Sequence, residues 1–432
     1  MIEFLAILFS TLIFFLTISV PLKKFFYFKL IDFETNIFDY YTINILVFSN
    51  ILLYLSILKF SISSIIIIMS TLIIFNLLLF LKSIKKKILN FDNLIFLTFF
   101  LLILFILSIN IAGNLTLGWD AQTIWFPRAI NFYNGLNFTE ISNYARMPEY
   151  PFFGSLGWAF FWKLFYFDKE YFGRIFYLLI FLVSIFNISD LFKISMIKKI
   201  FFSLILILLI YDYWHFRGFQ EILIFSFLLI ISKYLYYIIC EGKTDIRYLF
   251  IILISSNLII WTKNEGIIFS FLIYLILVIF SKFSLKIKVV NCVIFISIVF
   301  FRFFIFQSNE LTVGLQDTFD FKNIFGIFFE NFSVSNLKII FINLILTIFK
   351  FPIILISLLI SLVIFLSKIQ LKKIQFLYFY LFLNVGFIFV TYLSTTLDIN
   401  FMVVTGLNRV FFESSALYVL FGLFYLKNKF KI

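Results

Sequence analysis

Long apolar runs dominate the chain, and short polar or basic segments separate them. The runs are continuous and do not alternate with a period of two, which favours membrane-spanning helices and excludes the strands of a membrane barrel. Because a helix needs about 20 apolar residues to cross the bilayer, we predict about thirteen transmembrane helices. They cover residues of about 3–20, 42–58, 62–81, 94–112, 172–191, 199–213, 221–240, 247–262, 266–281, 289–306, 351–368, 375–396 and 410–426.

The composition supports an all-α polytopic membrane protein. Of 432 residues, 63% are hydrophobic and only 13% are charged, and the mean hydropathy is +1.11. About a quarter of the residues in a soluble domain are charged. The composition therefore excludes a soluble enzyme, a disordered chain and a nucleic-acid-binding domain, so we expect membrane lipids and no nucleic acid as partners. With 2 Cys and 1 His, the chain has no disulfide framework and no histidine-based metal site.

Lysine-rich segments orient the predicted helices. The net charge is +13, and basic residues cluster between the apolar runs, for example around Lys85, Lys198, Lys286 and Lys372. Cytoplasmic loops carry such an excess, so we place these clusters inside, the N-terminus outside and the C-terminus inside. In this layout all 6 Trp lie on the outer side. We expect residues 1–90 to form three N-terminal transmembrane helices and residues 91–432 to form the transmembrane core.

Two apolar segments, 151–167 and 338–350, do not fit as spans, because each begins and ends on the outer side of this layout. They are predicted to be interfacial or re-entrant helices, which are tolerated where they pack on protein. If either segment crosses the membrane, the orientation of everything beyond it reverses. A further amphipathic helix is expected over 121–134, in the large outer loop 114–150, with Gly135 at its end.

The outer connections carry the ionisable residues. Asp120 follows Trp119 at the start of the large loop, and it either caps the helix 121–134 or serves as a functional carboxylate; the two roles are compatible. Glu149 and Tyr150 lie between two prolines, which stiffen the backbone around them. They are either held at a membrane-level cavity or mark a simple turn before the next helix.

Three later outer connections contribute similar groups. Glu221 begins a helix, where the dipole alone would favour a carboxylate, and Lys263 lies near Glu265 at the bilayer edge, where a lysine can also snorkel. Arg409 and Glu413 lie at the start of the last span. Because ionisable residues at membrane depth are costly and commonly functional, we predict that these connections form one outward-facing polar cavity.

These residues resemble the GT-C superfamily of integral membrane glycosyltransferases, in particular a bacterial branch that uses lipid-linked sugars. The resemblance covers about residues 95–425 and rests on an ordered set of motifs, namely 118–135, Glu149-Tyr150-Pro151, Gly218–Glu221, Thr262–Gly266 and Thr405–Arg409. The sequence departs from the pattern at Arg146-Met147, where the family often has histidine, and at Glu221, where aspartate is commoner. The C-terminal soluble domain of some members is absent, which leaves the acceptor open.

The resemblance implies a GT-C-like fold and transfer of a sugar from a polyprenyl-phosphate donor to a glycan, lipid or protein acceptor, with inversion. It places the site at the periplasmic face of a bacterial inner membrane, where envelope glycans or glycolipids are assembled. Such a transfer needs a base and cations for the leaving phosphate. We expect Asp120 to be the base and Arg409 and Lys263 to hold the phosphate. The residues expected at the sugar or acceptor are Trp119, Glu149, Tyr150, Glu221 and Glu265, the last of which also orients Lys263. A divalent cation, Mg²⁺ or Mn²⁺, is left open.

Other functions remain open from the sequence. A flippase or transporter of lipid-linked glycans would also need a charged cavity, although no clear internal repeat is seen. A polysaccharide polymerase or ligase would share the chemistry, and the acidic loop 307–338 is a candidate for its large outer loop. A purely structural membrane subunit is the last alternative.

Overall fold

A computed structural model gives the fold of residues 37–83, 91–141, 147–148, 150–164, 168–191, 195–311, 320 and 322–430. Within these ranges every regular element is a helix, which confirms the all-α class. The predicted span at 3–20 lies outside the described residues, as does Asp317 of the acidic loop.

The helices of the N-terminal half include the predicted interfacial segments. In chain order they are α3 (Ile37–Ile57), α4 (Ile62–Ser83), α5 (Phe91–Ala112), the π-helical turn η1 (Ala121–Trp125), α6 (Phe126–Tyr133), α7 (Phe138–Ile141), α8 (Phe153–Leu164), α9 (Tyr171–Ser189), α10 (Met196–Ile210), η2 (Tyr213–Phe216), α11 (Glu221–Leu235) and η3 (Tyr236–Cys240). The helix predicted over 121–134 is present as η1 and α6, which together cover residues 121–133, and Gly135 follows after the cap residue Asn134 with φ +99°. The segment 151–167 contains α8, whose 12 residues are too few to cross a bilayer.

The helices of the C-terminal half are α12 (Ile246–Ile260), α13 (Glu265–Phe280), α14 (Leu285–Ser308), α15 (Ile324–Asn331), α16 (Val334–Lys350), α17 (Pro352–Leu366), α18 (Leu371–Leu393), α19 (Ile399–Met402), η5 (Val403–Leu407), α20 (Asn408–Ser414), η6 (Ser415–Tyr418) and α21 (Val419–Phe430). The segment 338–350 belongs to α16. This helix meets α15 at a bend of 87°, so the pair forms either a broken span or a re-entrant segment.

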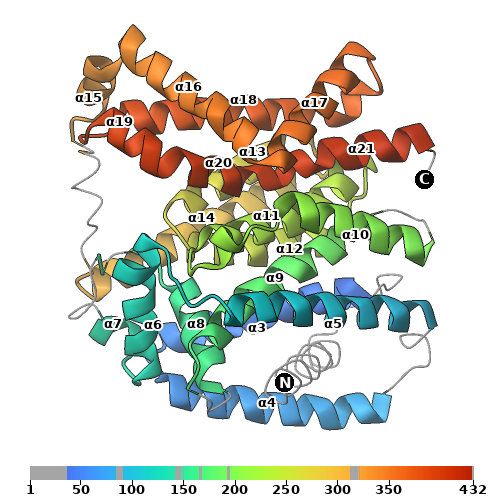
Figure 1. Ribbon diagram of the computed structural model, residues 1–432, viewed down its shortest axis with the longest axis vertical. Coiled ribbons are helices and arrows are strands. Elements are labelled where there is room, and N and C mark those ends of the chain that lie inside the picture. The colour runs from blue at the N-terminus through green and yellow to red at the C-terminus, as the bar shows by residue number, and fades with distance from the viewer. Residues whose placement is uncertain are drawn as a thin grey trace.

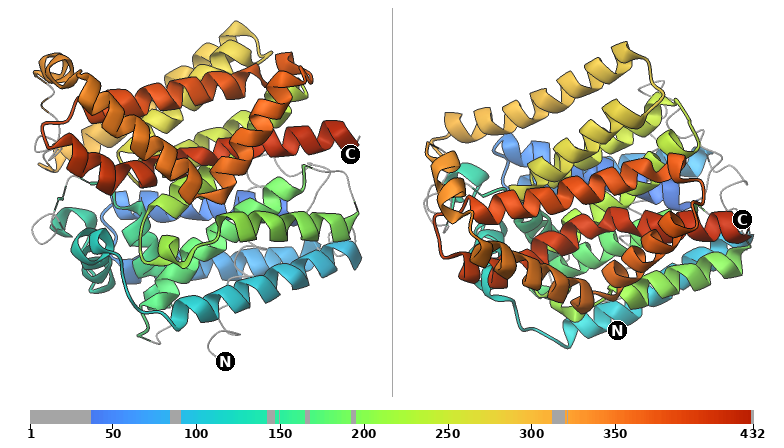
Figure 2. Two further views of the ribbon diagram at one scale, coloured as in Figure 1. Left: turned by 45° about the horizontal axis from the view of Figure 1, so that its top comes forward. Right: turned by 90° about the horizontal axis from the view of Figure 1, so that it is seen from above.

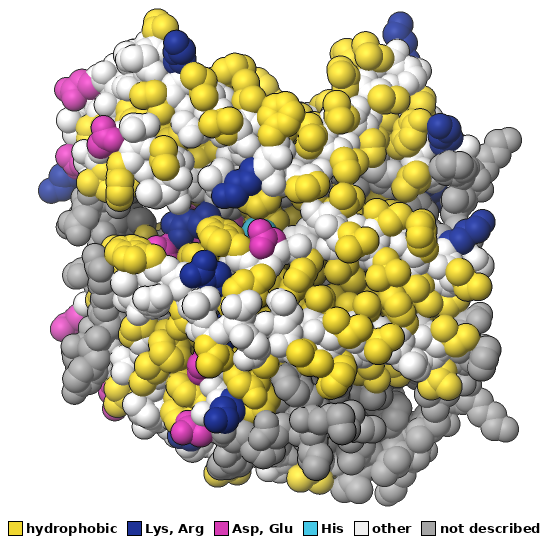
Figure 3. Space-filling view, viewed as in Figure 1, with side chains coloured by type: hydrophobic (Ala, Val, Ile, Leu, Met, Phe, Trp, Pro, Cys, Tyr) yellow, Lys and Arg dark blue, Asp and Glu magenta, His cyan; other side chains and the backbone are white. Residues whose placement is uncertain are grey.

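Six described helices are long and apolar enough to cross a membrane, and the bent pair α15–α16 would make a seventh. Five shorter apolar helices correspond to the predicted spans at 42–58, 62–81, 247–262, 266–281 and 351–368. The chain therefore has the helices of an integral membrane protein, while the total of about thirteen spans stays a prediction. Apolar side chains cover much of the face seen in Figure 3. Leu208, Phe300 and Phe304 are among the large apolar side chains that are exposed.

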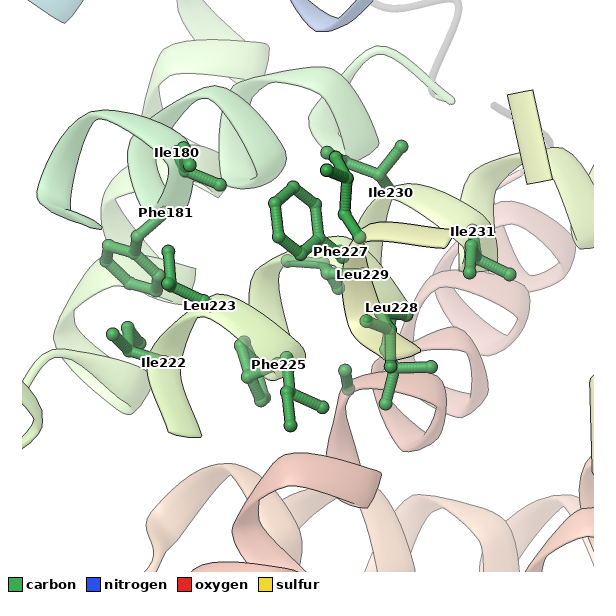
Figure 4. Close-up of a cluster of buried hydrophobic side chains, with 14 of the residues drawn as sticks. Ile180, Phe181, Ile222, Leu223, Phe225, Phe227, Leu228, Leu229, Ile230 and Ile231 are labelled. Carbon is green, nitrogen blue, oxygen red and sulfur yellow. The ribbon is translucent and has the colours of Figure 1, made fainter. Parts of the chain in front are cut away.

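The long helices run in broadly the same direction, and the short helices α6, α7, α15 and α19 lie at the end opposite the C-terminus (Figure 1 and Figure 2). In the predicted orientation that end is the outer one. At the centre, all 15 residues of α11 are buried, and α9 is buried along nearly its whole length. Figure 4 shows how side chains of α11 and α9, such as Phe181 and Phe227, build this core. A helix that is apolar all round is expected in such a central position.

A buried ionic cluster joins four helices, α3, α9, α10 and α11, at the C-terminal end of α11. The ammonium group of Lys233, in the last turn of α11, lies 2.7 Å from Asp39 Oδ1 in the first turn of α3. It also lies 3.6 Å from Asp190 Oδ2, just after α9, and Asp190 pairs in turn with Lys199. Asn187 and Tyr234 donate further hydrogen bonds to Asp39 Oδ1. We call these residues the Lys233 cluster.

The Lys233 cluster generates a prediction about stability. Lys233→Met leaves the Asp39 carboxylate buried without its main cation, so the free energy of unfolding should fall by about 3–5 kcal/mol. The double variant Asp39→Asn/Lys233→Met removes both charges and should recover most of the loss. Unfolding of the purified protein in mixed micelles, followed by tryptophan fluorescence, measures both. A single variant as stable as the wild type would contradict this account.

Candidate functional site

Charged residues from four separate chain segments meet at the outer end of the bundle. They are Asp120 at the start of η1, Glu221 at the start of α11, Lys263 and Glu265 at the α12–α13 connection, and Arg409 and Glu413 on α20. We call these six residues the outer network. Five of them are among the site residues predicted from the sequence, so the structure brings together groups separated by up to 289 positions.

Lys263 lies at the centre of the outer network and is 6% exposed. Its ammonium group is 2.7 Å from Glu413 Oε1, 3.3 Å from Glu221 Oε1 and 3.4 Å from Glu265 Oε1. Burial by itself lowers the pKa of Lys263, but the three carboxylates outweigh it and hold that pKa well above its ordinary value. Lys263 is therefore a charged group whose surroundings are already filled by carboxylates.

Arg409 links the buried part of the network to its exposed mouth. Its guanidinium pairs with the Asp120 carboxylate, and its Nε lies 3.6 Å from Glu221 Oε1. Glu221 is thus shared by two cations, whereas Asp120 and Arg409 each keep 22% of their side chains exposed. A ligand that approaches from outside would meet the Asp120–Arg409 pair before it met Lys263.

Two irregular helical turns hold this pair. Asp120 directly precedes the π-helical turn η1, and Arg409 is the second residue after the end of the π-helical turn η5. Single π-turns occur frequently at functional sites, where they redirect side chains. The Asp120 side chain makes no capping hydrogen bond to the helix that follows. The Asp120 side chain therefore does not act as a helix cap, which was one of the two roles that the sequence left open.

Glycines let the outer connections approach closely. The amide of Gly118 donates to the carbonyl of Arg217 over 2.9 Å, and a Cβ at Gly118 would fall 2.1 Å from the ring of Phe219. Gly218 has φ +86°, a conformation that glycine adopts without strain, and a Cβ there would crowd Trp158. These contacts place Phe219 beside the mouth, where the Arg409 guanidinium lies 5.9 Å from its ring centroid.

The remaining predicted site residues lie around this mouth or outside the described ranges. Trp119 is 65% exposed next to Asp120. The ring of Tyr150 packs against Trp125, and its carbonyl accepts a hydrogen bond from buried Arg128 over 2.8 Å. These contacts place Tyr150 in the wall built by the outer loop. Glu149 lies outside the described residues.

Glu413 and Arg302 were not among the predicted site residues, although Glu413 was counted in the predicted polar cavity. Glu413 is fully buried and is spaced four residues after Arg409, so both lie on one face of α20. Arg302 of α14 is buried and donates to the carbonyl of Ile260 over 2.7 Å and to the side chain of Asn264. It thereby braces the connection that carries Lys263. An arginine inside an apolar run is the signal that could have found it.

The outer network has an acidic surplus and free acceptor atoms. Four carboxylates face two cations, which leaves a formal charge of −2 among these six groups. The Oε2 atoms of Glu221 and Glu413 are buried and have no hydrogen-bond partner within the described part of the chain. Both can accept hydrogen bonds from hydroxyl groups. Among the residues that the structure describes, no group of three or more Asp, Glu, His or Cys has the spacing of a metal site.

Comparison with protein-family models, with curated proteins and with solved structures finds no match for this chain.

His215 forms a buried edge of the site. Its ring stacks on Phe412 with centroids 3.8 Å apart, and neither ring nitrogen has a hydrogen-bond partner among the described residues. Burial lowers the pKa of His215 to about 4, and Lys350 contributes in the same direction against the opposing effects of Asp212 and Glu221. The ring is therefore neutral at physiological pH.

The lowered pKa of His215 predicts a specific pH dependence. The unfolded chain takes up this proton near pH 6.5 and the folded protein only near pH 4, so stability falls as the pH drops through that window. His215→Phe keeps a ring against Phe412 but does not titrate. Between pH 6.5 and pH 4 the wild type should lose on the order of 3 kcal/mol more unfolding free energy than the variant. Identical pH profiles for the two proteins would show that His215 does not titrate in this way.

Proposed function

We propose that the chain is an integral membrane glycosyltransferase that moves a sugar from a polyprenyl-phosphate donor to an acceptor at the outer face of the membrane. The observation that carries the proposal is the outer network itself. Acids and bases from four segments form one connected set, which is partly exposed at the Asp120–Arg409 pair. A bundle with apolar outer helices and a polar mouth suits a substrate with a lipid tail and a sugar headgroup.

The proposed chemistry is one inverting displacement. The acceptor oxygen attacks the anomeric carbon, its proton passes to the Asp120 carboxylate, and the bond between that carbon and the phosphate oxygen breaks. Arg409 stabilises the negative charge that grows on the leaving phosphate. A phosphate that engages Arg409 competes with Asp120 for the same guanidinium, so binding of the donor would free the carboxylate to act as the base.

The buried residues hold this arrangement. With three carboxylates around its ammonium group, Lys263 acts through Glu221 and is a positioning residue in this proposal. Glu221 in turn lies beside Arg409 and keeps a free Oε2, which suits a sugar or acceptor hydroxyl. Trp119, exposed next to Asp120, supplies a flat apolar surface of the kind that packs against sugar rings. Glu149 and Tyr150 keep their proposed places at the substrate, and the site would face the periplasm of a bacterial inner membrane.

Asp120→Asn tests the proposal. The purified protein in lipid nanodiscs is given a panel of labelled polyprenyl-phosphate sugars and cell-envelope extract as the acceptor source. Loss of the base should reduce transfer by roughly 10²–10⁴-fold without loss of folding. Glu140→Gln is the matched control, because Glu140 is an exposed carboxylate of the same outer loop, and among the described residues its side chain accepts a hydrogen bond only from the backbone amide of Asn137.

Three results would contradict this account. Near wild-type transfer by Asp120→Asn would exclude Asp120 as the base. An equal loss of transfer in Glu140→Gln would show that any change in this loop impairs the protein. Donor binding with translocation across the bilayer, but no transfer by the wild type, would favour a flippase of lipid-linked glycans.

A further inference from the structure

The break between α16 and α17 reaches the edge of the outer network. The two helices are separated by Phe351 alone, and Pro352 begins α17. Proline restricts the residue before it to extended backbone, and Phe351 accordingly has φ −110° and ψ 105°. Its ring packs against Phe412 and His215, with centroids 5.2 Å and 5.8 Å away. The break is therefore fixed against the α20 helix that carries Arg409.

Lys350, the last residue of α16, is placed at this edge as an exposed cation. Its ammonium group lies 5.5 Å from the ring centroid of Trp214 and 5.6 Å from that of Phe351. Trp214 belongs to η2, in the connection between α10 and α11. Among the described residues, no carboxylate forms an ion pair with Lys350, in contrast to Lys263. Its charge is thus available to a ligand.

Arg217 adds a second cation to the same edge, three residues after Trp214. It donates to the carbonyl of Leu117 over 3.2 Å, and its buried Nε has no hydrogen-bond partner among the residues that the structure describes. The backbone of Arg217 also accepts from Gly118, so its position is tied to the loop that carries Asp120. A guanidinium group has five N–H donors, and a bond to one carbonyl oxygen uses only one of them. The others can bind an anion.

The edge as a whole is cationic, unlike the buried network behind it. Apart from the Asp120–Arg409 pair, which belongs to the outer network, the edge holds two cations, Arg217 and Lys350, and one carboxylate, Asp212, which leaves a formal charge of +1. The Asp212 carboxylate caps η2 by accepting from the amide of Trp214 over 3.0 Å. An anion is therefore the complementary ligand here.

Apolar side chains surround the edge on the membrane side. Leu346 and Phe349 of α16 are 60% and 67% exposed, and Leu208 of α10 is 79% exposed. Figure 3 shows charged side chains of both signs in a recess between apolar areas of this face. A hydrocarbon chain could lie against these residues while its anionic headgroup reached the recess.

From this geometry we infer that Lys350 and Arg217 bind the phosphate group of a membrane lipid, which reaches the outer network from the side of the bundle where α10 and α17 meet. The identity of that lipid as a sugar donor rests on the proposed function, but the binding of a lipid phosphate does not. Lys350 and Trp214 would fix the phosphate at the edge, and Arg409 would then meet the oxygen next to the sugar.

Binding measurements without transfer test the inference. The protein in phosphatidylcholine nanodiscs is titrated with a polyprenyl monophosphate, with the matching polyprenol, with phosphatidic acid and with inorganic phosphate. We expect the polyprenyl monophosphate to bind at least tenfold more tightly than the polyprenol or inorganic phosphate. Lys350→Gln and Arg217→Gln should each weaken it on the order of tenfold, because each removes a charged hydrogen-bond donor. Lys338→Gln is the matched control, since Lys338 is an exposed lysine near the start of the same α16 helix.

Each outcome decides between defined alternatives. Unchanged binding in both Lys350→Gln and Arg217→Gln, or an equal loss in Lys338→Gln, would overturn the site. Tight binding of the polyprenol or of inorganic phosphate would also overturn it, because the inference requires both the chain and the phosphate. Equal binding of phosphatidic acid would support the lipid-phosphate site and count against the polyprenyl donor, so the proposed function can fail while this site stands.

Discussion

One ammonium group, that of Lys263, is buried among three carboxylates, and the outer end of the bundle depends on this interaction. Taking a charge out of water costs several kcal/mol unless partners of opposite sign surround it. Here the partners come from α11, from α20 and from the turn that carries Lys263. None of these segments can move away without leaving a charge unpaired at membrane depth. The ion pairs therefore fix the relative positions of helices that apolar packing alone would allow to slide.

Charges also fix α11, which is buried along its whole length. Its first residue is Glu221, in the outer network, and its last turn carries Lys233, in the cluster with Asp39. A carboxylate at the N-terminus and an ammonium group at the C-terminus both agree with the helix dipole. The central helix is thus fixed at both ends by charges, and its apolar middle packs against α9. This rigidity gives the mouth at Asp120 and Arg409 a firm support, as a preorganised site requires.

The sequence predicted the helical class and most of the outer network, and it failed where contacts depend on folding. Apolar runs identify helices because their length and continuity are local properties. Asp120, Glu221, Lys263 and Arg409 could be selected because a charge at the end of an apolar run is costly wherever it lies. Their pairing could not be read from the chain, and neither could the burial of Lys263, since both depend on how distant helices cross. Lys350 ends the segment 338–350, which did not fit the predicted membrane topology. That its ammonium group lies near the ring of Trp214 is known only from the structure, in which the chain breaks at Phe351.

The most direct test of the account is a double-mutant cycle between Lys263 and Arg409, read as the free energy of unfolding. The two cations do not pair with each other, but they share the Glu221 carboxylate. Lys263→Met leaves Arg409 beside Glu221, Arg409→Gln leaves Lys263, and the double variant leaves neither. The account predicts that the double variant loses at least about 1 kcal/mol more than the sum of the single losses. Losses that add to within about 0.5 kcal/mol would show that the outer network is not one coupled unit.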